Sequence, residues 1–186
     1  MTRALIVIDV QESFRARTAE WAEINNPKIA DQVNRLVALA RDAGDLVVWV
    51  LHSEPGSGGV FDPALGQVRL LEELERREGE PLVHKTSHNA FTTTNLQQQL
   101  TEHGVTELVT CGIRTEQCVE TTTRVGSDLG YQVTFVSDAT ATHPITRDGV
   151  TLSADEIVRR TEFALADRFA TVATVAELEA QAVDRG

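Results

Sequence analysis

The fold of this chain is decided by the stretch Leu108-Val109-Thr110-Cys111-Gly112-Ile113-Arg114-Thr115-Glu116-Gln117-Cys118-Val119. It opens with an apolar run typical of a short buried strand, and Gly112 marks a turn. A helical pattern follows and ends at Gly130. We expect Thr115 to cap this helix, which places Cys118 in its first turn. There a thiol lies among unpaired backbone N–H groups at the positive end of the helix dipole, which favours the thiolate. Cys118 is therefore a candidate nucleophile.

Length, composition and charge narrow the class of protein. The chain of 186 residues is long enough for one sizeable core, and a single domain over residues 1–186 is expected. Hydrophobic residues make up 41% and charged residues 24%, as in ordinary globular proteins. A formal net charge of −11 argues against binding to nucleic acid or to anionic membranes. No apolar run approaches the roughly 20 residues of a membrane span, and the N-terminus lacks a signal-peptide pattern, so we expect a cytoplasmic location.

Apolar runs alternate with helical patterns along the whole chain. Strands are expected at residues 4–8, 46–51, 81–84, 108–110, 131–136 and 169–172. Helices are expected between them, the first long one opened by Asn26 and Pro27 and a short one around residues 68–74. Capping boxes at Ser153 and Thr174 begin the last two helices. The alternation predicts a three-layer α/β/α fold, a doubly wound and mostly parallel sheet of about six strands with helices on both faces.

Chemically useful residues follow the first four of these strands. Asp9 follows the first, His52 the second, Lys85 the third, and the turn that leads to Cys118 follows the fourth. Each has a simpler explanation when it is taken alone. An Asp after a strand often caps a turn, a lone Lys is a solvated charge, and a helical Cys is often a small hydrophobe. Because ligands bind beyond the carboxyl ends of parallel strands, the combination on one rim predicts a site.

These side chains are suited to acyl transfer through a thioester. A thiol needs a base or a positive neighbour, and Asp9 is a carboxylate that could take its proton. Lys85 could hold Asp9, stabilise the thiolate and orient the substrate. The backbone N–H groups of Arg114 and Cys118 could bind the developing oxyanion. Cys118 would attack a carboxamide, Asp9 would pass the proton to the departing nitrogen, and a water activated by Asp9 would release the acid.

Several motifs follow one another in a specific order over nearly the whole chain. They are Asp9-Val10-Gln11 with Phe14, Lys85 with Asn89-Ala90-Phe91, Thr94 with Leu96, Gly112 through Val119, and Asp138-Ala139. In this combination the chain resembles the isochorismatase-like cysteine hydrolases, which include nicotinamidases, N-carbamoylsarcosine amidase and ureidoacrylate amidohydrolases. The resemblance implies a triad of Asp9, Lys85 and Cys118. It also implies a cis peptide bond between Ile113 and Arg114.

Departures from the family pattern narrow the chemistry. Nicotinamidases carry a metal site of an Asp and two or three His residues shortly after the second strand. Here that stretch offers His52 and Glu54, so we expect no metal and no cofactor, and nicotinamidase activity is disfavoured. Isochorismatases proper cleave a vinyl ether by acid chemistry and many lack the Cys. Cys118 therefore favours an amidase, with vinyl-ether hydrolysis as the alternative and a non-catalytic binding module with a redox-sensing Cys118 as a third hypothesis.

Further side chains are candidates for the substrate pocket, with core packing or a satisfied loop position as the alternative. They are Phe14, His52, Phe61, Phe91 and Gln117. The Arg114 side chain either points at the substrate or packs elsewhere, and Cys111 is expected to be a buried, inert thiol. The sequence thus predicts a hydrolase that cleaves a C–N bond of a small carboxamide, carbamoyl or ureido substrate and releases ammonia or an amine. By the resemblance, it forms a homo-oligomer, either a dimer or a tetramer.

Overall fold

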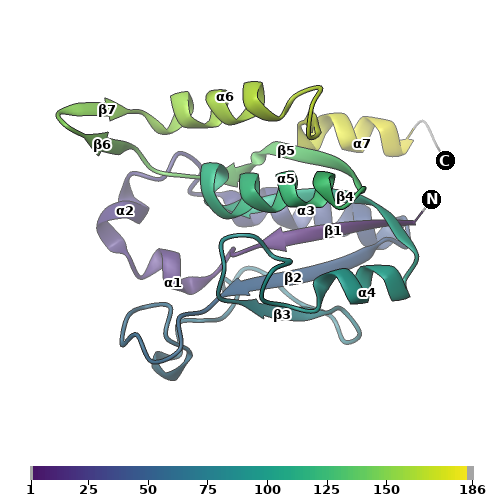
Figure 1. Cartoon of the computed structure of the whole chain (residues 1–186), viewed down its shortest axis with the longest axis horizontal. Helices are drawn as coiled ribbons and strands as arrows, with labels where there is room; N and C mark the ends of the chain where they lie inside the picture. Colours follow the sequence, from purple (N-terminus) through teal and green to yellow (C-terminus); the bar gives the residue numbers. More distant parts are fainter. Residues whose placement is uncertain (1, 184–186) are drawn as a thin grey trace.

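The computed structural model describes residues 2–183 and has the predicted three-layer architecture (Figure 1). Its central sheet contains six parallel strands in the order β3-β2-β1-β4-β5-β8. The strands are β1 (Thr2–Ile8), β2 (Leu46–His52), β3 (Leu82–Lys85), β4 (Val105–Ile113), β5 (Gln132–Ala141) and β8 (Thr171–Ala173). The strand order changes direction between β1 and β4, which is the position where doubly wound folds open a crevice for a ligand.

Helices cover both faces of the sheet, and a hairpin extends from one end of it. The helices are α1 (Glu12–Arg15), α2 (Thr18–Ala22), α3 (Ile29–Asp42), α4 (Leu96–Glu102), α5 (Glu120–Asp128), α6 (Ala154–Leu165) and α7 (Val175–Val183). Two short turns complete the set, a 3-10 turn η1 (Pro63–Leu65) and a π-helical turn η2 (Thr115–Val119). The hairpin, which the sequence did not predict, pairs β6 (Ile145–Arg147) with β7 (Val150–Leu152) in antiparallel fashion.

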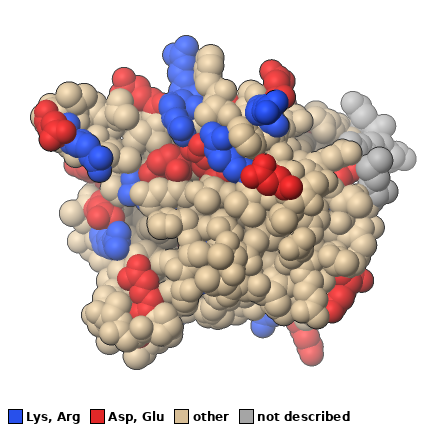
Figure 2. All heavy atoms as spheres, viewed as in Figure 1, with Lys and Arg blue, Asp and Glu red and all other residues tan. Residues whose placement is uncertain are grey.

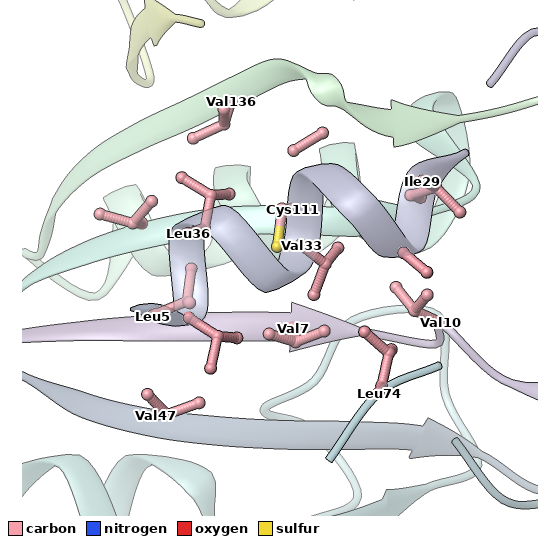
Figure 3. Close-up of a cluster of buried hydrophobic side chains, with 14 of the residues drawn as sticks. Leu5, Val7, Val10, Ile29, Val33, Leu36, Val47, Leu74, Cys111 and Val136 are labelled. Atoms are coloured by element: carbon pink, nitrogen blue, oxygen red, sulfur yellow. The ribbon is translucent and has the colours of Figure 1, made fainter. Parts of the chain in front are cut away.

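The core is divided by the sheet into two clusters, because successive side chains of a strand point to opposite faces. In β1, Leu5 and Val7 pack under α3, together with Val33 of that helix (Figure 3). Ile6 of the same strand packs on the other side with Leu96 of α4. Cys111 is fully buried beneath α3, as predicted. Burial on both faces explains why the strands are continuous apolar runs.

Outside the candidate site, two helix predictions are wrong. In both places, the residues expected to begin or form a helix instead contact residues that are distant in sequence. Helix α3 begins at Ile29, and the Asn26 side chain instead donates to the carbonyl oxygens of Asp138 (3.0 Å) and Thr140 (3.2 Å). Residues 68–74 do not form a helix, because Leu70 pairs with Gln11 in an isolated β-bridge. Asn26 and the bridge therefore fasten loops to the carboxyl end of the sheet.

The predicted capping boxes are both present. The Ser153 hydroxyl accepts from the N–H of Glu156 at 3.2 Å, and the Glu156 carboxylate accepts from the N–H of Ser153 at 2.8 Å. Thr174 and Glu177 make the same reciprocal pair at the start of α7. Each box satisfies backbone donors that a helix start leaves free, which accounts for the sharp start of both helices.

Charges on the face of the molecule in Figure 2 are mixed in sign. Lys and Arg side chains lie beside Asp and Glu side chains, mainly along the edge formed by α6 and the β6–β7 hairpin, and the surface over α4 and α5 carries few charges. This face therefore has no continuous basic stripe. Among the helices of residues 2–183, none combines the length and the apolar character needed to cross a membrane.

Candidate active site

Three neighbouring strands place polar side chains on one rim of the sheet. Asp9 follows β1, His52 ends β2 and Lys85 ends β3, and the register pairs His52 directly with Lys85. The backbone at Asp9 adopts a left-handed conformation (φ 55°), and its N–H still donates to the carbonyl of Val50 at 2.8 Å. Asp is one of the few side chains that adopt this conformation readily. The chain can therefore turn at the end of β1 while the carboxylate stays inside.

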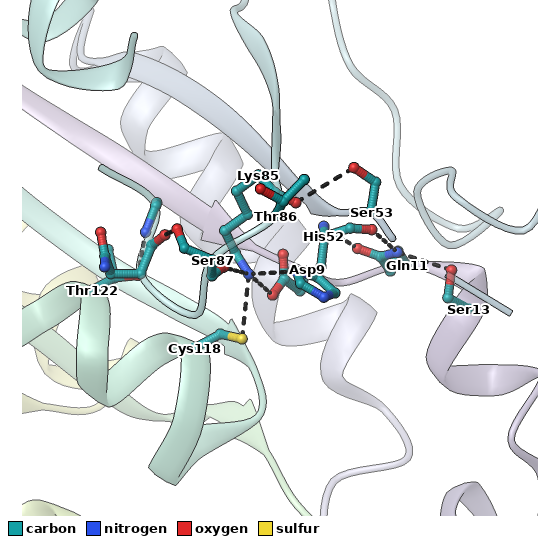
Figure 4. A network of polar contacts seen from close by, with 12 residues as sticks. Asp9, Gln11, Ser13, His52, Ser53, Lys85, Thr86, Ser87, Cys118 and Thr122 are labelled. Atoms are coloured by element: carbon teal, nitrogen blue, oxygen red, sulfur yellow. Dashed lines mark hydrogen bonds and ion pairs between the residues drawn. The ribbon is translucent and has the colours of Figure 1, made fainter. Parts of the chain in front are cut away.

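The three residues of the predicted triad converge in the structure (Figure 4). Lys85 Nζ lies 2.7 Å from Asp9 Oδ2 and 3.3 Å from Cys118 Sγ. The same ammonium donates to the carbonyl oxygen of Ser87 at 3.1 Å. Asp9 and Lys85 are fully buried, whereas Cys118 keeps 6% of its surface exposed. An ion pair thus lies beside a thiol that retains only a small exposed area.

Cys118 lies in the π-helical turn η2 that precedes α5, as expected for a residue at a helix start. Thr115 does not cap this turn, because its hydroxyl donates to Thr140 Oγ1 at 2.9 Å. The Arg114 carbonyl instead accepts from the N–H groups of both Gln117 and Val119, each at 3.2 Å. The expectation of a threonine cap is therefore wrong, and the turn is closed by the Arg114 backbone.

The environment of Cys118 favours the neutral thiol, contrary to the expectation of a thiolate. Burial and the negative charge of Asp9 raise the pKa of Cys118 to about 12, and the positive charge of Lys85 opposes this only in part. Burial also raises the pKa of Asp9 above its ordinary value, with Lys85 acting in the opposite direction. A carboxylate with a raised pKa is a stronger proton acceptor than an ordinary one. These shifts favour a protonated thiol beside a base over a preformed thiolate.

Gly112 allows β4 to approach β1 at this rim. A Cβ atom at residue 112 would lie 1.9 Å from the carbonyl oxygen of Ile8, and the backbone has φ 130°. No side chain fits at that distance, so the turn requires glycine. One residue further along, the peptide bond between Ile113 and Arg114 is cis, as the family resemblance implied.

Three of the five pocket candidates lie together beside the ion pair. The Phe14 ring meets the Phe61 ring edge to face at 5.1 Å, and Phe61 meets the His52 ring at 5.3 Å. His52 in turn places Nδ1 3.4 Å from Lys85 Nζ. The guanidinium of Arg17 lies over Phe61, 4.8 Å from the ring centre. These contacts form an aromatic wall that ends at the catalytic candidates.

The other candidates point elsewhere. Phe91 stacks on Tyr131 at 6.1 Å and packs in the core beside the side-chain-free Gly126 of α5. Gln117 is exposed to solvent. The Arg114 side chain packs outside the triad, where Nη2 pairs with Glu116 at 2.8 Å and Nε donates to Thr142 at 3.3 Å. Of the two readings for Arg114, packing elsewhere is the one observed.

Gln11 is a site residue whose role the sequence analysis missed. Its buried amide accepts from the N–H of His52 at 2.8 Å and donates to the His52 carbonyl at 3.0 Å. It also donates to Ser13 Oγ at 2.9 Å. Gln11 therefore joins the end of β1 to the end of β2 and fixes the backbone of His52. Its place in the Asp9-Val10-Gln11 motif was the available signal.

A small hollow lies next to this rim, between α2 and the loop that follows β5. Its lining includes Phe14, Trp21, Ile113, Arg114, Thr142 and His143. Within residues 2–183, no group of three or more His, Cys, Asp or Glu side chains is arranged to hold a metal ion. What the arrangement offers is a thiol, a carboxylate and an ammonium in contact, which is suited to nucleophilic attack with proton transfer.

Known proteins resemble this chain over nearly its full length. The family model for the Isochorismatase domain matches residues 3–177. The isochorismatase family protein YrdC of Bacillus subtilis (strain 168) is 30% identical over 177 residues, which cover 95% of this chain and 94% of YrdC. A streptothricin hydrolase of Streptomyces noursei is 35% identical over an alignment covering 98% of this chain and 73% of that protein.

A solved structure of a similar protein has the same fold as this chain. The cysteine hydrolase from Pseudomonas syringae pv. phaseolicola 1448A superposes with a TM-score of 0.89 at 25% identity, covering 99% of this chain and 93% of that one. The family match therefore extends from the sequence to the arrangement of the whole sheet and its helices. On these grounds the chain belongs to the isochorismatase family and is a hydrolase of that family.

Proposed function

We propose that this hydrolase cleaves a C–N bond of a small carboxamide, carbamoyl or ureido compound through a thioester on Cys118. The observation that carries the proposal is the position of Lys85 Nζ, 2.7 Å from Asp9 Oδ2 and 3.3 Å from Cys118 Sγ. This geometry joins a nucleophile to a base through one buried cation. Nucleophile, base and a group that orients the base are the components that covalent acyl transfer requires.

In the first half of the reaction, Cys118 Sγ attacks the carbonyl carbon of the substrate and its proton passes to Asp9. The backbone N–H groups of Arg114 and Cys118 donate to the oxyanion of the tetrahedral intermediate. Asp9 then returns the proton to the nitrogen, the C–N bond breaks, and ammonia or an amine leaves. The acyl group remains on Cys118 as a thioester. Proton transfer during attack is needed because the resting thiol is neutral, its pKa raised to about 12.

In the second half, Asp9 takes a proton from a water molecule that attacks the thioester carbon. The C–S bond breaks, the carboxylic or carbamic acid leaves, and the proton restores the Cys118 thiol. Lys85 keeps its proton throughout and holds the Asp9 carboxylate in place. The sum is one amide and one water converted into one acid and one amine. The atoms balance without a cofactor.

Two further observations support this assignment. One related protein is a streptothricin hydrolase, and a structural neighbour is a cysteine hydrolase. The small exposed area of Cys118 favours a small substrate. Phe14 and Phe61, whose rings lie beside His52, form the wall that such a substrate would contact.

The test is a screen of small amides, carbamoyl compounds and ureido compounds for release of ammonia or amine, with mass spectrometry for an acyl adduct on Cys118. Cys118→Ala should abolish release, whereas the matched Cys111→Ala should retain it, since Cys111 is buried under α3. Iodoacetamide should label Cys118 much faster than Cys111. Full hydrolysis of a vinyl ether by the Cys118→Ala variant would instead establish acid chemistry. Equally slow labelling of both thiols, without turnover, would favour a binding module.

A further inference from the structure

The contacts of the His52 ring determine where its single proton lies. Nδ1 is 3.4 Å from Lys85 Nζ, and Nε2 is 3.3 Å from Glu54 Oε1. An ammonium has donors and no acceptor, so Nδ1 must carry the lone pair. A carboxylate has acceptors and no donor, so Nε2 must carry the proton. The two neighbours together select the neutral Nε2–H tautomer of His52.

Lys85 is surrounded by more acceptors than it has N–H groups. Its ammonium has three donors. Four acceptor atoms lie within contact distance, namely Asp9 Oδ2 at 2.7 Å, Ser87 O at 3.1 Å, Cys118 Sγ at 3.3 Å and His52 Nδ1 at 3.4 Å. The two longest contacts, to Cys118 and His52, therefore share a donor. His52 is thus placed to affect how the ammonium is directed toward the thiol.

We propose that His52 is a positioning residue: its neutral ring, oriented by Glu54, accepts from Lys85 and holds the ammonium between Asp9 and Cys118. The inference rests on the proposed function for its catalytic meaning. It changes the predicted role of His52 from a contact for the substrate to a support for Lys85. Gln11 strengthens this role, because it fixes the His52 backbone from the other side.

The charges around His52 make its hold on the Lys85 ammonium depend on pH. The ring faces Lys85 of β3, Asp9 after β1 and Glu54 in the loop after β2, and its other neighbour is the Phe61 ring beneath Arg17. Burial lowers the pKa of His52, Lys85 lowers it further, and Asp9 and Glu54 oppose this. His52 is consequently neutral at neutral pH. In acid, protonation removes the lone pair and places a second positive charge 3.4 Å from Lys85 Nζ, which displaces the ammonium.

Labelling of Cys118 by iodoacetamide tests the support without any substrate. In His52→Asn the amide oxygen can occupy the place of Nδ1 and accept from Lys85, whereas His52→Leu offers no acceptor. Because Lys85 lowers the pKa of the Cys118 thiol, loss of its position should slow labelling near neutral pH. We expect His52→Leu to be slower than wild type on the order of tenfold, and His52→Asn to stay within about threefold. Equal slowing in both variants, or slowing in neither, would overturn the proposal.

Nitrogen NMR of the imidazole groups tests the tautomer and the part played by Glu54. The chain has five histidines, and the His52 signals are those missing from the His52→Asn spectrum. We expect a bare Nδ1 and a titration below the ordinary value of about 6.5. The Glu54 side chain is half exposed, and Glu54→Gln should move the titration lower by about half a pH unit, the size typical of one such ion pair. A proton on Nδ1, or an unmoved titration, would contradict the proposal.

These readouts separate the two proposals. An amide screen without turnover, together with the expected labelling and NMR results, would leave the His52 support standing and remove the proposed reaction. Turnover of an amide by the wild type, with both His52 variants equally impaired, would leave the reaction standing. In that case His52 would be a packing or substrate-contact residue.

Discussion

Gly112 lies against Ile8 so closely that a Cβ atom on residue 112 would be 1.9 Å from the Ile8 carbonyl oxygen. The approach brings the end of β4, and with it the turn that carries Cys118, beside the end of β1, which carries Asp9. The contact therefore helps to place Cys118 near Asp9, the nucleophile and the base of the proposed reaction. It also makes the site sensitive to one methyl group.

Gly112→Ala should destabilise the protein by more than about 4 kcal/mol, because the methyl group forces the two strands apart. Gly130→Ala is the matched control. Gly130 also has a positive φ (93°) but open space around its Cβ position, so it should lose about 1 kcal/mol from backbone strain alone. Urea denaturation followed by circular dichroism measures both. Similar losses in the two variants would mean that the conformation, and not the contact with Ile8, requires glycine.

Asp9 and Lys85 should be strongly coupled in stability. Asp9→Asn or Lys85→Met alone leaves one charge buried without its partner, at a cost of about 3–5 kcal/mol. The double variant buries no charge, so it should be more stable than the sum of the single losses by roughly 1–3 kcal/mol, while activity stays absent. Asn tolerates the left-handed backbone at residue 9. The four proteins form a thermodynamic cycle that denaturant unfolding can close. Strict additivity would show that the two side chains act independently in the folded protein.

The rim of the site could be predicted from sequence because it follows from two strong signals. Continuous apolar runs identified strands buried on both faces, and the residues after them, Asp9, His52 and Lys85, had to share one edge of a parallel sheet. Neither signal depends on detailed packing. The register between β2 and β3 then places His52 opposite Lys85.

Predictions that relied on local rules were less successful, because long-range contacts overrode them. Asn26 resembled a helix cap, yet its amide binds carbonyls at residues 138 and 140. The dipole argument for a thiolate considered the helix start and omitted the burial and the Asp9 charge that raise the pKa of Cys118. Phe91 resembled a pocket residue, but its ring stacks on that of Tyr131, which is distant in sequence. Each of these partners becomes visible only once the chain is folded.

The pH profile of the reaction should distinguish a neutral thiol from a preformed thiolate. Because the pKa of Cys118 is raised to about 12, kcat/KM should show no rise near pH 8.5, where a free cysteine would ionise. On the acid side, activity should fall as the pH passes downward through the raised pKa of Asp9, because a protonated Asp9 cannot accept the thiol proton. Rates on a substrate from the amide screen, measured from about pH 4 to about pH 10, test both the expected fall in acid and the expected absence of a rise near pH 8.5. A rise centred near pH 8.5 would mean that thiolate forms before attack.

Glu120 should link the stability of α6 to the reactivity of Cys118. It begins α5 two residues after the thiol, and its buried carboxylate accepts from Arg124 at 2.8 Å, from Thr161 at 3.3 Å and from Arg160. Glu120→Ala removes the contacts to all three partners and should cost about 2 kcal/mol, together with slower iodoacetamide labelling of Cys118. Arg160→Ala is the control, because the Arg160 side chain is 63% exposed and its loss should cost less than about 1 kcal/mol. If Arg160→Ala is as damaging as Glu120→Ala, the ion pair to α6 alone holds the start of α5. If Glu120→Ala leaves labelling unchanged, η2 keeps the thiol in place without this carboxylate.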